Sequence, residues 1–184
     1  AKVGTPTMGG LLILSALIFS TLLWARLDTP YVWIVLGVTT AFGLIGFADD
    51  YAKVTKQNTK GVSSKLRIFL GLVIAALATY GASYFHPPEL THQLALPVFK
   101  NLLIPMGLFF LPFGTIVIVG AANAVNLTDG LDGLAIMPVM IAAGTFGVIS
   151  YLVGNYNFAE YLGLHFVPGT GEILIFCAAL FGAG

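Results

Sequence analysis

The stretch from residue 32 to residue 50 reads Val32-Trp-Ile-Val-Leu-Gly-Val-Thr-Thr-Ala-Phe-Gly-Leu-Ile-Gly-Phe-Ala-Asp-Asp50. The part before the two aspartates carries no charge and has about the minimum length of a transmembrane helix, roughly 17 residues. A carboxylate at the centre of a membrane helix costs about 2.5–3.5 kcal/mol on insertion scales. Acidic side chains beside such a run are therefore more often part of a site. The stretch predicts a membrane helix with a polar site at its end.

The composition of the whole chain agrees with a membrane location. Of the 184 residues, 58% are hydrophobic and 9% are charged, whereas about 25% are charged in a typical soluble domain. Such a chain cannot cover itself with a water-facing surface, so we expect an integral membrane protein in contact with membrane lipids. Eight basic and eight acidic residues give a net charge of zero, which argues against nucleic acid as a partner.

Several further apolar runs have the length of a membrane span. We expect an all-α polytopic membrane protein with about five complete spans, a single membrane domain over residues 1–184 and a sixth span that begins near Glu172. The expected spans are Met8–Trp24, Val32–Ala48, Ile68–Phe85, Leu102–Gly120 and Leu134–Leu152. Pro105 and Pro112 are expected to kink the fourth span. Between spans, Gln93–Phe99 predicts a short strand or hairpin, and Asn155–Leu164 predicts an interfacial helix.

The basic residues predict the orientation. Five of the eight lie in or beside one short loop: Lys53, Lys56, Lys60, Lys65 and Arg67. The positive-inside rule places this loop in the cytoplasm. Counting spans from there puts the N-terminal segment and the Gly120–Gly133 connection on the same side. All of the acidic residues that could form a site then face the cytoplasm.

The acidic pair Asp49-Asp50 has two interpretations. The carboxylates could serve as a general base or bind a divalent cation, since Mg²⁺ prefers one or two carboxylates together with phosphate oxygens. The alternative is a salt bridge at a helix end, because Lys53 lies four residues from Asp49 and three from Asp50. The pair alone favours neither interpretation.

A second cluster follows in the stretch Asn123-Ala-Val-Asn-Leu-Thr-Asp-Gly-Leu-Asp-Gly133. Asn123 and Asn126 are three residues apart, as are Asp129 and Asp132, so on a helical turn each pair shares a face. Two amides and two carboxylates suit recognition of a nucleobase, a ribose or a hydrated metal ion. The alternative is a cytoplasmic turn in which Asp129 caps the next helix. We favour the binding site.

Three motifs give the chain a family resemblance. They are Gly4-Thr-Pro-Thr-Met-Gly-Gly10, then Phe47-Ala-Asp-Asp-Tyr-Ala-Lys53 with Thr59-Lys-Gly61, and Asn123-Ala-Val-Asn-Leu-Thr-Asp-Gly-Leu-Asp-Gly-Leu-Ala135. In order and separation they resemble the phospho-N-acetylmuramoyl-pentapeptide transferases, within the polyprenyl-phosphate sugar-1-phosphate transferase superfamily. The resemblance implies a Mg²⁺-dependent enzyme of the bacterial inner membrane, with its active site on the cytoplasmic side. Such an enzyme transfers phospho-MurNAc-pentapeptide from UDP-MurNAc-pentapeptide to undecaprenyl phosphate, giving lipid I and UMP in peptidoglycan synthesis.

The resemblance also implies roles for individual residues. Asp49 matches the proposed base that deprotonates the lipid phosphate, and Asp50 lies by the metal, so both are candidate metal residues. The remaining matches are candidate substrate-binding residues. Those expected around the uridine or the sugar nucleotide are Lys2, Thr7, Asn126, Asp129 and Asp132, and those expected to line the cytoplasmic cleft are Asn123, Lys53 and Lys65.

Members of that family continue through further spans, which carry the principal magnesium ligand and a histidine-rich loop. We therefore expect that ligand beyond Gly184, and we expect residues 1–184 to be a partial chain that is incomplete for activity. One alternative is a sister enzyme that transfers GlcNAc-1-phosphate to a polyprenyl phosphate. Alternatives from other classes are an ion or solute transporter and an inactive fragment that binds a partner. The sequence leaves the oligomeric state open, with a homodimer as one option.

Overall fold

The computed structural model describes residues 9–55, 61–96, 99, 102–128 and 134–184. Within these ranges the chain is mainly helical, with a single two-stranded hairpin. In chain order the elements are α1 (Gly9–Trp24), α2 (Pro30–Thr55), α3 (Ser64–Phe85), β1 (Gln93–Ala95), β2 (Leu103–Pro105), the 3-10 turn η1 (Gly107–Phe109), α4 (Phe110–Thr128), α5 (Ile136–Gly154), α6 (Tyr156–Leu162), the 3-10 turn η2 (Thr170–Glu172) and α7 (Ile173–Ala183).

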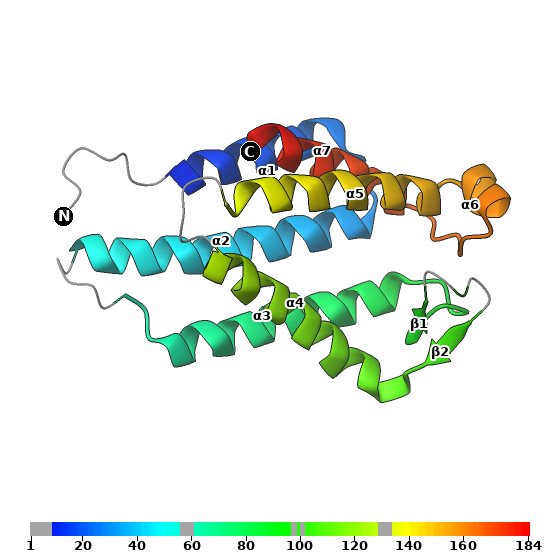
Figure 1. Cartoon of the computed structure of the whole chain (residues 1–184), viewed down its shortest axis with the longest axis horizontal. Coiled ribbons are helices and arrows are strands. Elements are labelled where there is room, and N and C mark those ends of the chain that lie inside the picture. The colour runs from blue at the N-terminus through cyan, green and yellow to red at the C-terminus, as the bar shows by residue number, and fades with distance from the viewer. Residues whose placement is uncertain (1–8, 56–60, 97–98, 100–101, 129–133) are drawn as a thin grey trace.

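α2 lies at the centre of the bundle, where it contacts α1, α3 and α7. On one side α7 packs against α1 and α5, and on the other α3 packs against α4, which crosses it at a steep angle (Figure 1). The buried apolar core lies among α1, α2 and α7 and contains Leu17, Ala25, Val32, Leu36, Phe176 and Cys177. Crossing helices approach closely where a small residue meets the neighbour. At the α3–α4 crossing, a Cβ built at Gly114 would lie 2.6 Å from Thr79 Cγ2.

The surface of this bundle is suited to lipid. Four described helices are long and apolar enough to cross a membrane: Pro30–Thr55, Ser64–Phe85, Gly107–Thr128 and Ile136–Gly154. Gly9–Trp24 and Thr170–Ala183 are shorter apolar helices. Large apolar side chains such as Phe19, Phe69 and Leu77 are exposed on the surface. An apolar surface of this kind is favourable in lipid and unfavourable in water. The expected all-α membrane fold is confirmed.

The fourth span differs from the sequence prediction. Leu103–Pro105 forms strand β2, and the helix runs from Phe110 to Thr128 instead of Leu102 to Gly120. Pro105 therefore lies in the strand, and Pro112 lies in the first turn of α4, where the missing N–H has no helical partner to lose. The two prolines set the start of the helix and do not kink it. As a result, Asn123 and Asn126 lie on the last turns of a helix.

Two helices are longer than the apolar runs that predicted them: α2 at its C-terminal end and α3 at its N-terminal end. α2 continues seven residues beyond Ala48 and so carries Asp49, Asp50 and Lys53 on helical turns. α3 begins at Ser64, because the Ser63 side chain caps it by accepting a hydrogen bond from the Leu66 N–H at 3.4 Å. Arg67 is consequently on the first turn of α3.

The opposite end of the bundle carries the small elements. β1 pairs antiparallel with β2, with Leu94 opposite Ile104, which confirms the expected hairpin. The helix predicted within Asn155–Leu164 is α6, capped by Asn155, whose side chain accepts from the Phe158 N–H, and its interfacial position stays a prediction. Gly163 ends α6 in the left-handed conformation, with φ of 65°. The hairpin and α6 lie far from the ends of α2 and α3 that hold the acidic and basic residues (Figure 1).

Replacing Gly154 by alanine should destabilise the fold, because a Cβ there would overlap the backbone of Gly171. No change of rotamer relieves a contact with backbone, and overpacking of this kind costs about 1–3 kcal/mol. We expect Gly154→Ala to lower the thermal unfolding midpoint of the protein in detergent. Gly120→Ala is the matched control, because nothing lies within 4 Å of a Cβ at that position. Equal midpoints for the two variants would contradict the close contact between Gly154 on α5 and Gly171 on η2.

Candidate active site

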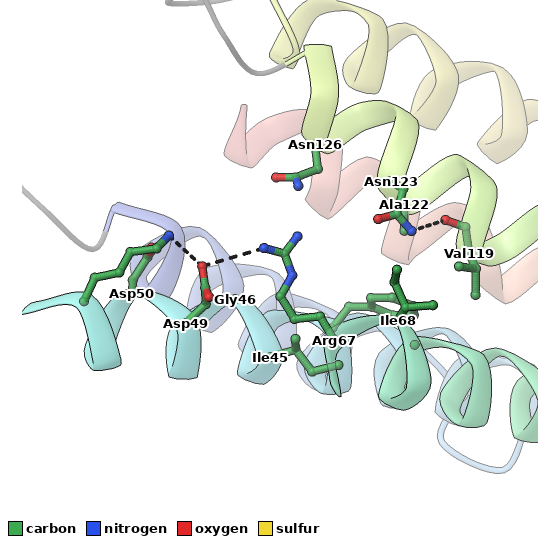
Figure 2. Close-up of a pocket in the computed structure, with 13 residues that line it drawn as sticks. Ile45, Gly46, Asp49, Asp50, Arg67, Ile68, Val119, Ala122, Asn123 and Asn126 are labelled. Atoms are coloured by element: carbon green, nitrogen blue, oxygen red, sulfur yellow. Dashed lines mark hydrogen bonds and ion pairs between the residues drawn. The ribbon is translucent and has the colours of Figure 1, made fainter. Parts of the chain in front are cut away.

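A cavity of about 620 Å³ opens where the C-terminal end of α2, the start of α3 and the C-terminal part of α4 meet. This volume is within the range of about 300–1,000 Å³ that small-molecule sites occupy. Apolar residues such as Phe42, Ile45 and Ile68 form part of its wall, and Figure 2 shows the polar side chains gathered around it. The polar lining consists of Asp49, Asp50, Lys53, Arg67, Asn123 and Asn126.

Asp49 is the enclosed carboxylate of the cavity. Only 7% of the residue is exposed, and a buried charge is costly unless it is paired and hydrogen-bonded. Its Oδ2 lies 2.6 Å from Lys53 Nζ and 3.8 Å from an Arg67 guanidinium nitrogen. Its Oδ1 accepts a hydrogen bond of 2.8 Å from the Val62 N–H. Both oxygens are therefore engaged by groups from α2, from α3 and from the segment before α3.

Asp50 has the opposite environment, although it is the next residue. Its side chain is 71% exposed, and the contact with Lys53 is a long 3.4 Å. The carboxylate is therefore accessible to a ligand. Mg²⁺ binds through one or two carboxylates and completes its shell with water and substrate phosphates, so an accessible Asp50 fits this cation. In the described part of the chain, no three His, Cys, Asp or Glu side chains are close enough to hold a metal by themselves.

The principal magnesium ligand predicted beyond Gly184 falls outside residues 1–184 and stays a prediction. Gly184 itself follows the last turn of α7 as its C-cap. It lies against α5, where a Cβ built on it would be 3.0 Å from Ile136 Cγ1 and from Met140 Cγ. Gly184 is not among the residues that line the cavity. The candidate metal residues that the described chain brings to the cavity are therefore Asp50 and Asp49.

The cations of the site face the same space as the carboxylates. Lys53 bridges Asp49 and Asp50 from the next turn of α2, which is the helix-end salt bridge that the spacing indicated. Arg67 reaches across from α3 toward Asp49 (Figure 2). A guanidinium has a planar fork of donors that matches phosphate oxygens, whereas an ammonium acts as a point charge. The pair offers both kinds of contact to a diphosphate.

The asparagines form the wall opposite α2 and α3. Asn123 and Asn126 project from one face of α4 toward the cavity (Figure 2), as their spacing of three residues predicted. The Asn123 Nδ2 donates to the Val119 carbonyl at 2.8 Å, which leaves its carbonyl oxygen as an acceptor. The side chain of Asn126, also on α4, has no hydrogen-bond partner among the described residues. Both amides are therefore available for polar contacts with a ligand.

The structure brings together five of the residues that the sequence singled out: Asp49, Asp50, Lys53, Asn123 and Asn126. Lys65 is exposed and does not line the cavity. It precedes Arg67 by two residues, which turns it by about 200° around the helix axis, away from the Arg67 face. The other four candidates, Lys2, Thr7, Asp129 and Asp132, lie outside the described residues.

Arg67 is the one polar residue of the described cavity lining that the sequence analysis did not select. Arg67 is one of five neighbouring basic residues, and the sequence analysis uses it only to predict the orientation in the membrane. The sequence did contain a pattern that groups Arg67 with other cavity residues. Arg67, Ile68 and Gly71 have the spacing of one helix face, and all three line the cavity. This pattern becomes visible only if the helix begins before Ile68, as α3 does at Ser64.

Comparisons with known proteins agree on one family. The profile of glycosyl transferase family 4 matches residues 32–183. Residues 2–14 match signature 1 of the phospho-N-acetylmuramoyl-pentapeptide-transferases. The 32–183 match includes every polar residue of the cavity.

Individual relatives are also close. The chain is 70% identical over 184 residues to the phospho-N-acetylmuramoyl-pentapeptide-transferase of Ruegeria sp. (strain TM1040), and 71% identical to that of Ruegeria pomeroyi. It is 64% identical to the protein of the same name from Dinoroseobacter shibae. All of the chain is covered in each case, but it spans only 51% of the length of each relative. Because the family profile matches most of its length, the chain belongs to glycosyl transferase family 4.

Proposed function

We propose that the full-length protein containing this chain transfers phospho-MurNAc-pentapeptide from UDP-MurNAc-pentapeptide to undecaprenyl phosphate, giving lipid I and UMP. The observation that carries the proposal is the convergence of two carboxylates, two cations and two amides in one cavity at the end of a membrane bundle. The names of relatives that are 70% and 71% identical support the same activity.

In the proposed reaction, an oxygen of the lipid phosphate attacks the β-phosphorus of the UDP-sugar. A new P–O bond forms there, and the bond from this phosphorus to the bridging oxygen breaks, so that the electron pair leaves with UMP. Phosphoryl transfer depends mainly on positioning and on neutralising the charge of phosphate oxygens. Arg67 and Lys53 supply positive charge at the cavity, where they would hold the diphosphate and draw in the lipid phosphate.

The two aspartates take different parts in this scheme. The lipid phosphate that the cations attract is brought beside Asp49, which is in contact with both of them and would accept the proton of a protonated phosphate oxygen. The exposed Asp50 would hold Mg²⁺, which neutralises phosphate oxygen charge when it is bound. Asn123 and Asn126, on the facing helix, would contact the nucleotide.

The proposal includes the location of the site. A nucleotide-sugar is made in the cytoplasm, and the lipid substrate presents its phosphate at the membrane surface. A cavity at a helix end, rather than at mid-membrane, suits both substrates. Lys53, Lys65 and Arg67 lie at this end, which supports a cytoplasmic orientation by the positive-inside rule. We therefore place the protein in the bacterial inner membrane with this end inside. The same position counts against a transporter, since transporters usually bind near the midplane.

The first test removes each carboxylate charge in the full-length protein. Asp49→Asn and Asp50→Asn should each lower the rate of lipid I formation by about 100-fold or more, on the scale of losing one transition-state contact. The rate is measured over a range of Mg²⁺ concentrations. Asp28→Asn is the matched control, because Asp28 is an exposed, ion-paired aspartate near the start of α2, whereas the cavity lies near its C-terminal end. Full activity of either site variant would remove that residue from the mechanism.

The second test compares two basic residues of α3 that differ in direction. Arg67→Gln should raise the KM for the UDP-sugar and lower kcat much more than Lys65→Gln does, because only Arg67 lines the cavity. Each substitution removes one positive charge, so a general loss of membrane-surface attraction would affect both equally. Equal or reversed effects in steady-state kinetics would show that the described cavity is not where the diphosphate binds.

The third test decides between the proposed sugar and that of the sister enzyme. With UDP-MurNAc-pentapeptide and UDP-GlcNAc supplied together, we expect the full-length protein to form only the muramoyl lipid product. To distinguish these two substrates, the enzyme must contact the sugar or the peptide, because the nucleotide is the same in both. Products are separated by mass. A polyprenyl diphosphate carrying GlcNAc as the main product would assign the protein to the sister reaction.

A further inference from the structure

The two oxygens of Asp49 have different partners. Oδ2 faces Lys53 and Arg67, and both of these side chains line the cavity. Oδ1 points to the segment before α3, where the Val62 N–H donates to it at 2.8 Å. A backbone donor cannot swing away as a side chain can, so this hydrogen bond fixes the rotation of the carboxylate. Of the two oxygens, only Oδ2 is held by side chains alone, which are able to shift and admit a substrate phosphate.

Gly61 makes this arrangement sterically feasible. A Cβ built at Gly61 would overlap Asp49 Oδ1 and would lie 2.8 Å from Asp49 Cγ. The next nearest atom, Lys53 Cε at 3.0 Å, belongs to a flexible side chain that is able to move. The backbone of Gly61 is not in the left-handed region, which in the described chain is occupied by Gly107, Gly163, Gly169 and His92. Glycine is therefore required here for space next to the carboxylate and not for its backbone conformation.

We propose that Gly61 is a positioning residue: by lacking a side chain, it lets the Gly61-Val62 backbone close over Asp49 Oδ1, so that Oδ2 alone is presented to the substrate phosphates. The inference rests on the proposed function, because it names the oxygen of Asp49 that would take the proton. That proton would move from a lipid phosphate oxygen to Oδ2, and the phosphate oxygen would then attack the UDP-sugar.

Orientation matters for such a step. A general base must lie within hydrogen-bond reach of the proton that it accepts, and a displacement of about 1 Å can cost on the order of 100-fold in rate. A methyl group at residue 61 would push the carboxylate out of its place or separate Val62 from it. In either case Oδ2 no longer has a fixed direction. The substrate contacts proposed for Arg67 and the α4 asparagines do not involve residue 61, which is not among the residues that line the cavity.

The kinetic experiment uses Gly61→Ala in a full-length protein that contains this sequence. We expect kcat for lipid I formation to fall by about 10- to 100-fold, with the KM values for the UDP-sugar and for undecaprenyl phosphate unchanged. The rate is expressed per folded molecule, so a loss of folded protein alone would leave kcat unchanged. Gly37→Ala on α2 is the matched control, because nothing lies within 4 Å of a Cβ there and Gly37 does not line the cavity.

A double-mutant cycle on thermal stability tests the contact itself, whether or not the Gly61→Ala protein is active. In the Asp49→Ala background the carboxylate is absent, so a methyl group at residue 61 has room. We expect Gly61→Ala to lower the thermal midpoint of the otherwise unaltered protein, or to prevent its folding, and to have a much smaller effect in the Asp49→Ala background. Neighbouring groups in contact show such non-additive effects.

The outcomes separate this inference from the proposed function. Unchanged kcat in Gly61→Ala, or an equal effect on folding in both backgrounds, overturns the positioning role while the unaltered protein still makes lipid I. If the unaltered full-length protein forms no lipid I, the proposed function fails. The stability cycle then still decides whether Gly61 is needed to accommodate the Asp49 carboxylate.

Discussion

The enclosed carboxylate of Asp49 must be neutralised where it lies, because a buried charge without partners is strongly destabilising. Its partners come from three places: Lys53 one turn along α2, Arg67 on α3, and the Val62 backbone between them. Satisfying this one group fixes the end of α2 against the start of α3. α4 then follows α3 through the close contact of Gly114 with Thr79, which brings the asparagines to the facing wall of the cavity.

This requirement explains why the site is polar and yet compact. The cations that neutralise Asp49 are also suited to bind phosphate oxygens, so the side chains that stabilise the buried carboxylate are the ones that would hold the proposed diphosphate substrate. Asp50 lies outside this arrangement, with most of its side chain in contact with solvent. Two adjacent aspartates on one helix thus differ in burial and in partners, which permits them to differ in role.

Much of the fold follows from the sequence, since a membrane helix requires a long apolar run and such runs are easily recognised. The sequence singled out five residues that line the cavity: the two acids after Val32–Ala48, Lys53 one turn beyond them, and the two α4 asparagines. The ends of helices were harder to predict, because they depend on capping, on the hairpin and on tertiary ion pairs that hydropathy does not show. Lys65 and Arg67 illustrate this limit, since composition treats them alike although their directions differ by about 200°. Which of them faces the cavity depends on the helix that Ser63 initiates.

The length of α2 has a consequence for the membrane in which the protein works. Its 26 residues extend about 39 Å at 1.5 Å per residue, against a hydrocarbon core of roughly 30 Å. In the proposed orientation, this surplus would project the last turns of α2 into the headgroup layer, at the depth of a lipid phosphate. A thicker bilayer would draw the acids into hydrocarbon, and a thinner one would lift them above the phosphates. If the proposed function holds, the match between helix length and bilayer thickness would set the depth at which a water-soluble nucleotide and a lipid-anchored phosphate meet.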